Sequence, residues 1–242
     1  MHVLDTMRHT PGVRAFADEL IPPQTIERVL DAARYAPSGM NRQPWRVVAV
    51  TDPAQRRAVG SLYARVWQSF VAERVREGRM ARDSPAEAEG TRFAQSFATV
   101  PAQLAVWVDV QAVDVTDELT QSPSIVAGGS VFPFVQNILL ASRAEGIGTR
   151  LTTLLAREPA ALRQLLRVPD NYALACVIAM GYPDRWPTRL SRRPVDTFAT
   201  WDHFDGIAVL PSNVPAATGA AGEALPRTSL PPVTPLLDLT QP

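Results

Sequence analysis

The chain has 242 residues, enough for one substantial domain with a sizeable core, and its apolar content of 46% is ordinary for a globular protein. The 24 basic and 24 acidic side chains balance, so the composition favours neither nucleic acid nor an anionic membrane as a partner. All 24 basic residues are arginines, which excludes a Walker A phosphate loop and Schiff-base chemistry, because both need a lysine.

Cysteine content and hydropathy restrict the cellular context. The single cysteine, Cys176, leaves no internal disulfide, and it lies in an apolar run where we expect a small buried side chain. No run approaches the roughly 18 to 20 apolar residues that span a bilayer. The first residues, with Asp5 and Arg8, lack the apolar core of a signal peptide. The sequence therefore predicts a cytoplasmic protein without a transmembrane segment.

The first third of the chain predicts two helices around one strand. Residues 1–20 are polar and are expected to form a short entry segment. A helix is predicted over residues 22–36, where apolar residues recur with the spacing of an amphipathic helix. The apolar run at residues 47–50 predicts a buried strand. A helix over residues 52–77 is predicted from its Asp-Pro start, which suits an N-cap and a first helical position.

The middle of the chain alternates between strands and helices. Residues 78–95 are charged and punctuated by glycine, which predicts a mobile excursion. Further on, the pattern predicts a strand, a long central helix, a shorter helix and a third buried strand at residues 104–110, 131–143, 157–167 and 173–180. Strands separated by long helices indicate a mixed α/β or α+β layer fold.

The composition changes after Gly206. Residues 207–242 contain seven of the 22 prolines and only three charged residues. Such a segment cannot form a core of its own, which predicts a domain over residues 1–206 followed by a proline-rich arm over residues 207–242. The composition leaves open whether this arm is disordered or lies along the body or a partner subunit.

The most informative segment is the joint at residues 36–45, between the first predicted helix and the first predicted strand. A helix-to-strand connection needs only a glycine or proline break. Here two prolines and a glycine accompany four polar side chains, those of Ser38, Asn41, Arg42 and Gln43. The cluster of donors and acceptors suits the flat polar edge of a ligand. An ordinary turn is the alternative interpretation.

Several common sites lack support in the sequence. Gly146 and Gly148 begin a glycine-rich turn, but Leu151 stands where a dinucleotide-binding fingerprint needs its third glycine. The three histidines are scattered without ligand spacing, so no metal site is predicted. Ser38 does not lie in a G-x-S-x-G elbow, which gives no support to serine hydrolysis.

Four segments together resemble a known family. The joint at residues 36–45 is similar to the A-P-S-x-x-N-x-Q-P-W signature of the FMN-dependent nitroreductases, and residues 13–16 resemble their V-R-x-F element. Two later family segments are matched by residues 146–149 and 189–195, and all four matching segments occur in the order in which the family has them. The resemblance implies an α+β fold, with a central sheet wrapped by helices in a three-layer sandwich and assembled as an intertwined homodimer.

The resemblance also implies which residues contact the isoalloxazine ring of FMN. Arg14 matches the residue of the V-R-x-F element that approaches the pyrimidine edge and N1. Pro37, Ser38 and Asn41 match loop positions that contact the flavin from the neighbouring subunit, and Gln43 would support these contacts or pin the loop. The backbone around Thr152 and Thr153 matches the place from which relatives present an N–H group to flavin N5.

The phosphate of FMN calls for cations, and here the chain departs from the pattern. Arg192 or Arg193 matches the C-terminal cation that grips the phosphate, and Arg189 is a third candidate. On the N-terminal side, the candidates are Arg8, His9 and Thr10. Many relatives place basic and hydroxyl residues directly before the V-R-x-F element, whereas this chain has a Pro-Gly pair at residues 11–12.

The implied function is oxidoreduction by hydride transfer through flavin N5, with no catalytic side chain. NADH or NADPH would be the electron donor, and a small electron-poor acceptor such as a nitroaromatic or a quinone would take its place in a ping-pong cycle. Trp67 and Phe70 either border the acceptor cavity or belong to the core. Two alternatives stay open: a specialised relative, which dehydrogenates small heterocycles or peptides, removes halogen or fragments flavin, and an FMN-holding protein without turnover.

Overall fold

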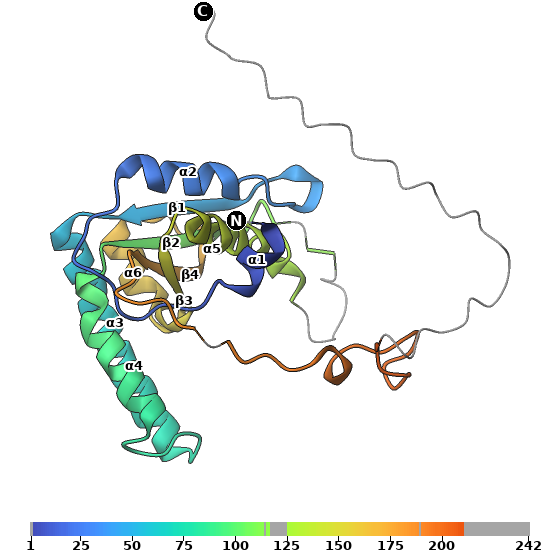
Figure 1. The fold of residues 1–242 in the computed structure, drawn as a ribbon. Coiled ribbons are helices and arrows are strands. Elements are labelled where there is room, and N and C mark those ends of the chain that lie inside the picture. Colours follow the sequence, from blue (N-terminus) through green and yellow to red (C-terminus); the bar gives the residue numbers. More distant parts are fainter. Residues whose placement is uncertain (1, 114, 117–124, 189, 211–242) are drawn as a thin grey trace, which may run out of the picture. The chain divides into compact units, whose positions relative to one another are not determined.

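The computed structural model describes residues 2–113, 115–116, 125–188 and 190–210 (Figure 1). The chain divides into two compact units, residues 1–190 and residues 191–242. Most of the predicted arm lies outside the described residues, so the boundary expected at residues 206 and 207 stays a prediction. No helix in the described part of the chain is both long and apolar enough to cross a membrane.

The first unit is built on a four-stranded antiparallel sheet. The strands run in the order β1 (Trp45–Val50), β2 (Ala102–Asp109), β4 (Tyr172–Gly181) and β3 (Gly148–Thr152). The predicted strands β1, β2 and β4 are confirmed within a few residues. β3 was not predicted, because its sequence, Gly-Thr-Arg-Leu-Thr, has a single strongly apolar residue and no apolar run.

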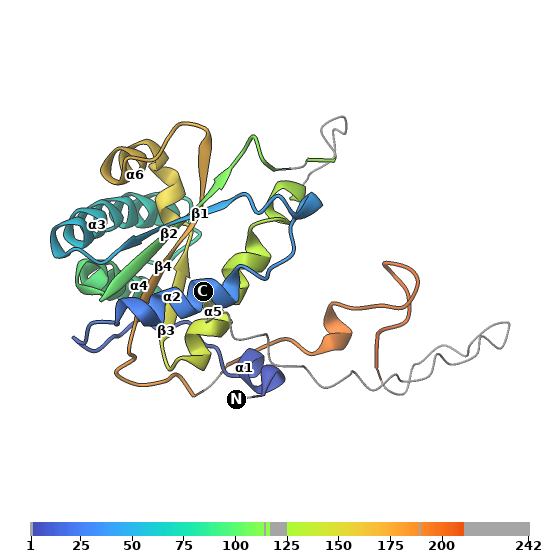
Figure 2. The same cartoon turned by 90° about the horizontal axis from the view of Figure 1, so that it is seen from above.

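One face of the sheet is covered by α2 (Pro23–Ala33) and α5 (Phe132–Ala144), the two helices predicted at residues 22–36 and 131–143. Side chains alternate along a strand, and those of Leu104 and Val106 on β2 point to this face. They pack with Val29, Ile138 and the other apolar residues of the two helices in one buried cluster. Figure 2 shows α5 on the opposite side of the strands from α3.

The other face is covered by α3 (Pro53–Arg76), α4 (Pro85–Ser96) and α6 (Pro159–Leu166). Ala105 and Trp107, the residues of β2 that alternate with those of the first face, are buried here. The sheet thus lies between two helical layers, and the predicted three-layer α+β architecture is confirmed.

The start of α3 follows the predicted pattern. The carboxylate of Asp52 accepts a hydrogen bond from the backbone N–H of Gln55 at 2.9 Å, and Pro53 occupies the first helical position. Further along the helix, Trp67 and Phe70 are half-buried, and their rings lie 5.7 Å apart. Trp67 packs against the core cluster of this face, and it also lines a cavity.

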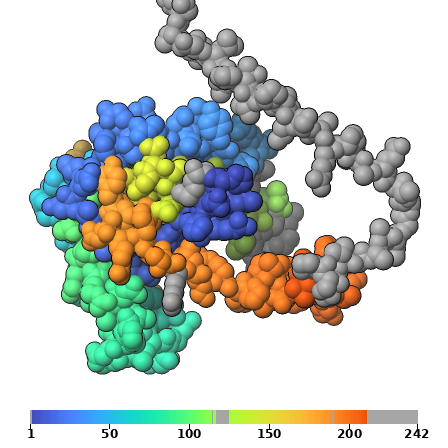
Figure 3. Space-filling model, viewed as in Figure 1, coloured from blue at the N-terminus to red at the C-terminus, as the bar shows by residue number. Residues whose placement is uncertain are grey.

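Two predicted loops are helical in the structure. The expected excursion at residues 78–95 is wrong over most of its length, because α4 begins there with Ser84 as its N-cap. Phe93 and Ala94 are buried on the inner side of α4, in the core cluster to which α3 also contributes. In Figures 1 and 3 the α3–α4 pair forms a projection from the first unit. Similarly, α1 (Val3–Arg8) replaces part of the polar entry segment.

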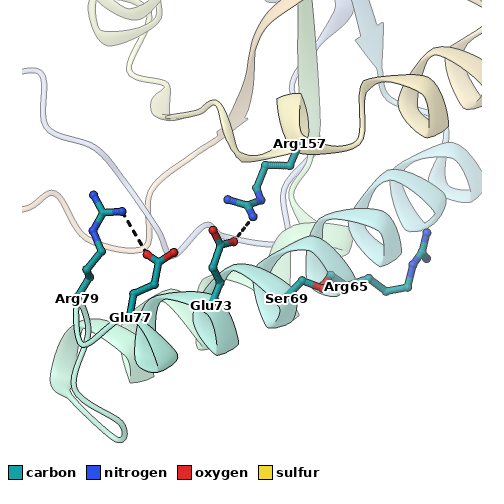
Figure 4. Close-up of polar contacts among 6 residues, drawn as sticks. All are labelled: Arg65, Ser69, Glu73, Glu77, Arg79 and Arg157. Atoms are coloured by element: carbon teal, nitrogen blue, oxygen red, sulfur yellow. Dashed lines mark hydrogen bonds and ion pairs between the residues drawn. The ribbon is translucent and has the colours of Figure 1, made fainter.

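Five short 3-10 helices complete the described elements. They are η1 (Gly39–Asn41), η2 (Phe97–Thr99), η3 (Val126–Gly128), η4 (Leu154–Arg157) and η5 (Val195–Thr197). Figure 4 shows how η4, which follows β3, is tied to α3 by an ion pair between Arg157 and Glu73. Towards the end of the same helix Glu77 pairs with Arg79 at 3.2 Å, while the side chain of Arg65 extends away from these contacts.

The N-terminal segment runs beside the edge strand β3. Gly12 forms a parallel bridge with Thr149, and the backbone N–H of Val13 donates to the carbonyl oxygen of Thr149 at 2.8 Å. Further along the segment, Phe16 forms an antiparallel bridge with Pro183, just after the end of β4. This pairing places Arg14 next to β3, at the edge of the sheet.

Candidate functional site

A cavity of about 220 Å³ lies where the N-terminal segment, α3, α4 and β3 meet. Its polar lining consists of Arg14, Tyr63, Glu89, Arg150 and Thr152. The apolar remainder includes Trp67 and Phe93. Elements distant in the sequence therefore bring two arginines, one carboxylate and two hydroxyl groups around one small space.

The charges in this cavity do not balance. Arg14 forms an ion pair with Glu89, with 3.0 Å between the guanidinium nitrogen and the carboxylate oxygen. The half-buried Arg150 has no ion pair with any described carboxylate. Burial first, and the nearby positive charge of Arg14 second, lower the pKa of Arg150, so both effects act against the charged form. The lining carries a surplus of one positive charge, which favours an anionic ligand.

The guanidinium group of Arg150 occupies space that Gly12 leaves open. A Cβ atom on residue 12 would lie 2.7 Å from Nη1 of Arg150 and 3.3 Å from its Cδ. Such contacts are closer than carbon and nitrogen atoms tolerate without a shift. The glycine therefore allows Arg150 to lie against the backbone just before Arg14.

Tyr63 and Thr152 form the neutral side of the cavity. The hydroxyl group of Thr152 donates to the hydroxyl oxygen of Tyr63 at 3.4 Å and accepts from the backbone N–H of Leu154 at 3.2 Å. Burial raises the pKa of Tyr63, although the hydrogen bond from Thr152 and the nearby arginines oppose the shift. The phenol is thus kept neutral and can hydrogen-bond without adding charge.

Other hollows also lie in the first unit. One of about 430 Å³ adjoins the cavity, shares Arg14 and Glu89 with it, and is also lined by Arg92 and Asp184. A larger groove of about 1390 Å³ runs along α2 over mainly apolar residues. Its lining includes none of the site residues predicted from the sequence, so we place the chemistry at the smaller, charged cavity.

The joint at residues 36–45 is held by side-chain hydrogen bonds. The hydroxyl oxygen of Ser38 accepts from the backbone N–H of Gln43 at 3.0 Å, and that of Ser130 accepts from the N–H of Gly39 at 3.0 Å. The side-chain amide of Gln43 donates to the carbonyl and amide oxygens of Asn41, both at 3.2 Å. Ser38 and Gln43 therefore fix the loop itself.

This loop also stores backbone strain. Met40, Asn41 and Gln43 have φ angles of 51°, 54° and 49°, in the left-handed region that non-glycine residues rarely adopt. Each such residue costs on the order of 1 to 3 kcal/mol and persists where its surroundings enforce it. The side chain of Met40 is exposed in the protomer. Strain and exposure together mark the loop as a functional candidate.

The structure brings together only part of the predicted site. Arg14 and Thr152 line the same cavity, and Thr153 follows as the exposed N-cap residue of η4. The loop residues do not line that cavity within the protomer. These loop residues are Pro37, Ser38, Asn41 and Gln43.

None of the predicted N-terminal phosphate ligands lines the cavity of the first unit. Arg8 is exposed at the end of α1, and the hydroxyl group of Thr10 donates back to the carbonyl oxygen of Thr6 at 2.6 Å. Arg192 and Arg193 are exposed residues of the second unit. Arg189, the third C-terminal candidate, lies outside the described residues.

Tyr63, Glu89 and Arg150 were missed by the sequence analysis. Tyr63 resembles any other aromatic residue of an amphipathic helix, and Glu89 lies in the stretch expected to be mobile. Arg150 carried a usable signal, because an arginine interrupts the segment that follows the Gly146 turn. Within the described ranges no three histidine, cysteine, aspartate or glutamate side chains gather in a way that could hold a metal ion.

Comparison with known proteins identifies the family. A sequence model of the Nitroreductase family matches residues 7–182, which is most of the first unit. The chain belongs to this family, and the resemblance found in its motifs is confirmed.

Individual relatives differ in activity. The 5,6-dimethylbenzimidazole synthase of Rhodospirillum rubrum is 32% identical, over 71% of this chain and 77% of the relative. The 4-nitrobenzoate reductase of a Nocardioides species is 26% identical, over 82% and 90% of the two chains. A crystal structure of oxidized iodotyrosine deiodinase bound to FMN and 3-iodo-L-tyrosine shares the fold, with a TM-score of 0.65, 23% identity, and coverage of 84% and 100%.

Proposed function

We propose that this protein is an FMN-dependent oxidoreductase that uses NADH or NADPH to reduce a nitroaromatic, a quinone or a similar electron-poor acceptor. The observation that carries the proposal is the half-buried cavity at β3, where Arg14, Arg150 and Thr152 line one space with a surplus positive charge. Such a lining suits a cofactor that carries a phosphate and becomes more negative when reduced. Among the similar solved structures, several were determined with FMN bound.

Each residue has a defined task in this proposal. Bound FMN would supply the hydride chemistry at N5 in a ping-pong cycle, and the chain would bind, orient and tune the ring. Arg14 would place its positive charge at the pyrimidine edge and stabilise negative charge near N1. The backbone near Thr152 and Thr153 would present N–H donors to the middle of the ring, and the C-terminal arginines Arg192 and Arg193 would bind the phosphate.

The exposed, strained loop motivates a homodimer as the working form. Ser38 and Asn41 do not line the cavity of their own protomer, whereas the family signature assigns their segment to flavin contacts. We propose that the loop completes the site of the partner subunit. Sedimentation of the FMN-loaded protein tests this, and a monomer that retains stoichiometric FMN would contradict it.

A specialised reaction is the second candidate. The relative with 32% identity is a 5,6-dimethylbenzimidazole synthase, and iodotyrosine deiodinases also match this chain. Either activity would use the same cavity with another occupant above the flavin. The cytoplasmic location expected from the sequence stays a prediction under both candidates.

Anaerobic stopped-flow spectroscopy of the FMN-reconstituted protein separates these candidates. We expect NADH or NADPH to bleach the flavin absorbance within seconds and a quinone or nitroaromatic to restore it. Bleaching slower than minutes with both donors would contradict a nicotinamide-driven reductase and favour the specialised candidate. Turnover of NAD(P)H with a quinone would exclude a protein that only holds FMN. Protein that stays colourless after reconstitution would overturn the flavin proposal itself.

A further inference from the structure

Arg150 is a half-buried arginine that forms no ion pair with any carboxylate in the described part of the chain. The charged residues that line its cavity are Arg14, Arg150 and Glu89, and the single carboxylate is paired with Arg14. Tyr63 adds no negative charge, because its phenol is kept neutral. A half-buried guanidinium group without a counter-ion is costly unless a ligand supplies the missing charge.

The backbone provides a dedicated space for this side chain. Gly12 forms a bridge with Thr149, the neighbour of Arg150 on β3, so the two segments are fixed against each other. The guanidinium group lies where a side chain of residue 12 would begin, 2.7 Å from the position of its Cβ atom. The positively charged group of Arg150 therefore lies against the N-terminal segment at Gly12, two residues before Arg14.

The other candidates on this side of the cavity are not available for the same task. The hydroxyl group of Thr10 is used in a hydrogen bond to Thr6, and Pro11 has no backbone N–H to donate. Arg8 is exposed and lines neither of the two adjoining hollows. The N-terminal segment therefore offers space but no free cation of its own next to Arg14.

We infer that Arg150 binds the phosphate monoester of FMN, as the cation that β3 supplies to the N-terminal segment through the space left by Gly12. This inference rests on the proposed function and assigns a cofactor-binding residue that the sequence analysis did not find. The planar fork of a guanidinium group suits a phosphate, with which it forms two parallel hydrogen bonds.

The test compares FMN with riboflavin, which has the same ring and ribityl chain but no phosphate. Binding of each flavin to the full-length protein is measured by quenching of flavin fluorescence, for the wild type, Arg150→Met, Arg150→Lys and the exposed control Arg65→Met. We expect Arg150→Met to weaken FMN binding about 10- to 100-fold, the loss for hydrogen bonds to a charged group, and to change riboflavin binding less than about twofold. Arg150→Lys should recover part of the loss, and Arg65→Met should match the wild type.

A second variant, Gly12→Ala, tests whether the space at residue 12 is needed. It gives evidence that does not depend on correct folding of Arg150→Met. Gly12→Ala keeps the arginine but displaces its guanidinium group, so it should also weaken FMN binding more than riboflavin binding. In the Arg150→Met background the same glycine substitution should have little further effect, because the clash is gone.

The outcomes separate the two proposals. FMN affinity equal to wild type in a folded Arg150→Met protein would overturn the inference and leave the flavin proposal standing. Equal weakening of FMN and riboflavin would also overturn it, because the phosphate would then not be the partner. Unchanged FMN binding with weaker NADPH binding would assign Arg150 to the phosphate of the nicotinamide cofactor and contradict the inference. Wild-type protein that binds neither flavin would overturn the proposed function together with this inference.

Discussion

The two faces of the sheet differ in what they enclose. Under α2 and α5 the buried cluster is formed by apolar side chains and the thiol of Cys176. Under α3 and α4 an equally apolar cluster stops short of the edge strand β3, where Arg14 and Arg150 line a polar cavity. One face is closed mainly by apolar packing, whereas the other leaves Arg150 without an ion pair among the described residues, which suits an anionic ligand.

This difference reflects the edge position of β3. β2 and β4 lie inside the sheet, so helices cover both of their faces with apolar side chains. β3 has a neighbouring strand on one side only, and the N-terminal segment with Arg14 pairs along its other side. Polar residues are tolerated at such an edge, and a site can form there without opening the core.

The largest effect on cofactor binding is expected from Arg14→Ala. This substitution removes a positive charge from the polar cavity at β3, on the α3–α4 face, which we call the polar face. FMN binding should weaken about 10- to 100-fold, because hydrogen bonds that involve a charged group such as the guanidinium contribute on the order of 1.5 to 3 kcal/mol. The flavin potential should also fall, because a cation near N1 favours the anionic reduced ring over the neutral oxidised ring. Titration with FMN, followed by flavin fluorescence, measures the affinity, and a redox titration under saturating FMN measures the potential.

Arg193→Ala provides the matched comparison for that titration. The phosphate carries the same charge in both redox states of the flavin, so this variant should weaken binding and leave the potential unchanged. A potential equal to wild type in Arg14→Ala would mean that Arg14 serves the other end of the cofactor. The polar face would then bind FMN without tuning it.

A smaller effect, on the pH dependence of stability, is expected for Cys176. This residue is fully buried on the α2–α5 face of the sheet, which we call the apolar face. Burial raises the pKa of its thiol from 9.0 to about 12. Above pH 9 the unfolded chain loses this proton and the folded chain keeps it, so the free energy of unfolding should fall as the pH rises from 9 towards 12. At pH 10 the loss is about 1.4 kcal/mol.

Urea unfolding of wild type and Cys176→Val at pH 7.5 and pH 10 tests this expectation. The valine variant lacks the thiol, so its free energy of unfolding should fall less between the two pH values than that of the wild type. The same pH dependence in both proteins would show that the thiol titrates normally, and that water reaches the α2–α5 face.

The apolar face was largely predictable from the sequence, because its signals are local. The helical spacing of Ile26, Val29 and Ala33 predicts the buried side of α2, and short apolar runs predict β1, β2 and β4. The cap at Asp52 likewise predicts the start of α3. The loop at residues 36–45 was recognised for the same reason, since its polar residues are contiguous.

The polar cavity was predictable only in part: the family resemblance pointed to Arg14 and Thr152, but the site is assembled from segments far apart in the sequence. Arg14, Glu89 and Arg150 come from the N-terminal segment, a helix expected to be a mobile excursion, and a strand that was not predicted. No local pattern indicates that Gly12 leaves space for an arginine 138 positions later. That relation depends on the pairing of the N-terminal segment with β3, which is a tertiary contact.

The smallest effect on FMN affinity is expected from a substitution of Glu89, the single carboxylate in the lining of the cavity. Its ion pair with Arg14 is partly exposed, with 36% and 49% of the two side chains accessible, so it contributes about 0.2 to 1 kcal/mol. In the proposed site FMN would compete with Glu89 for Arg14. Glu89→Gln should therefore tighten FMN binding about 1.4- to 5-fold at low ionic strength. The gain should shrink in 1 M salt, where charges are screened over about 3 Å.

Glu77→Gln, at the Arg79 pair of α3, serves as the control and should leave FMN affinity unchanged. Weaker binding in Glu89→Gln would show instead that the carboxylate orients Arg14 for the flavin, and that the polar face needs its one negative charge.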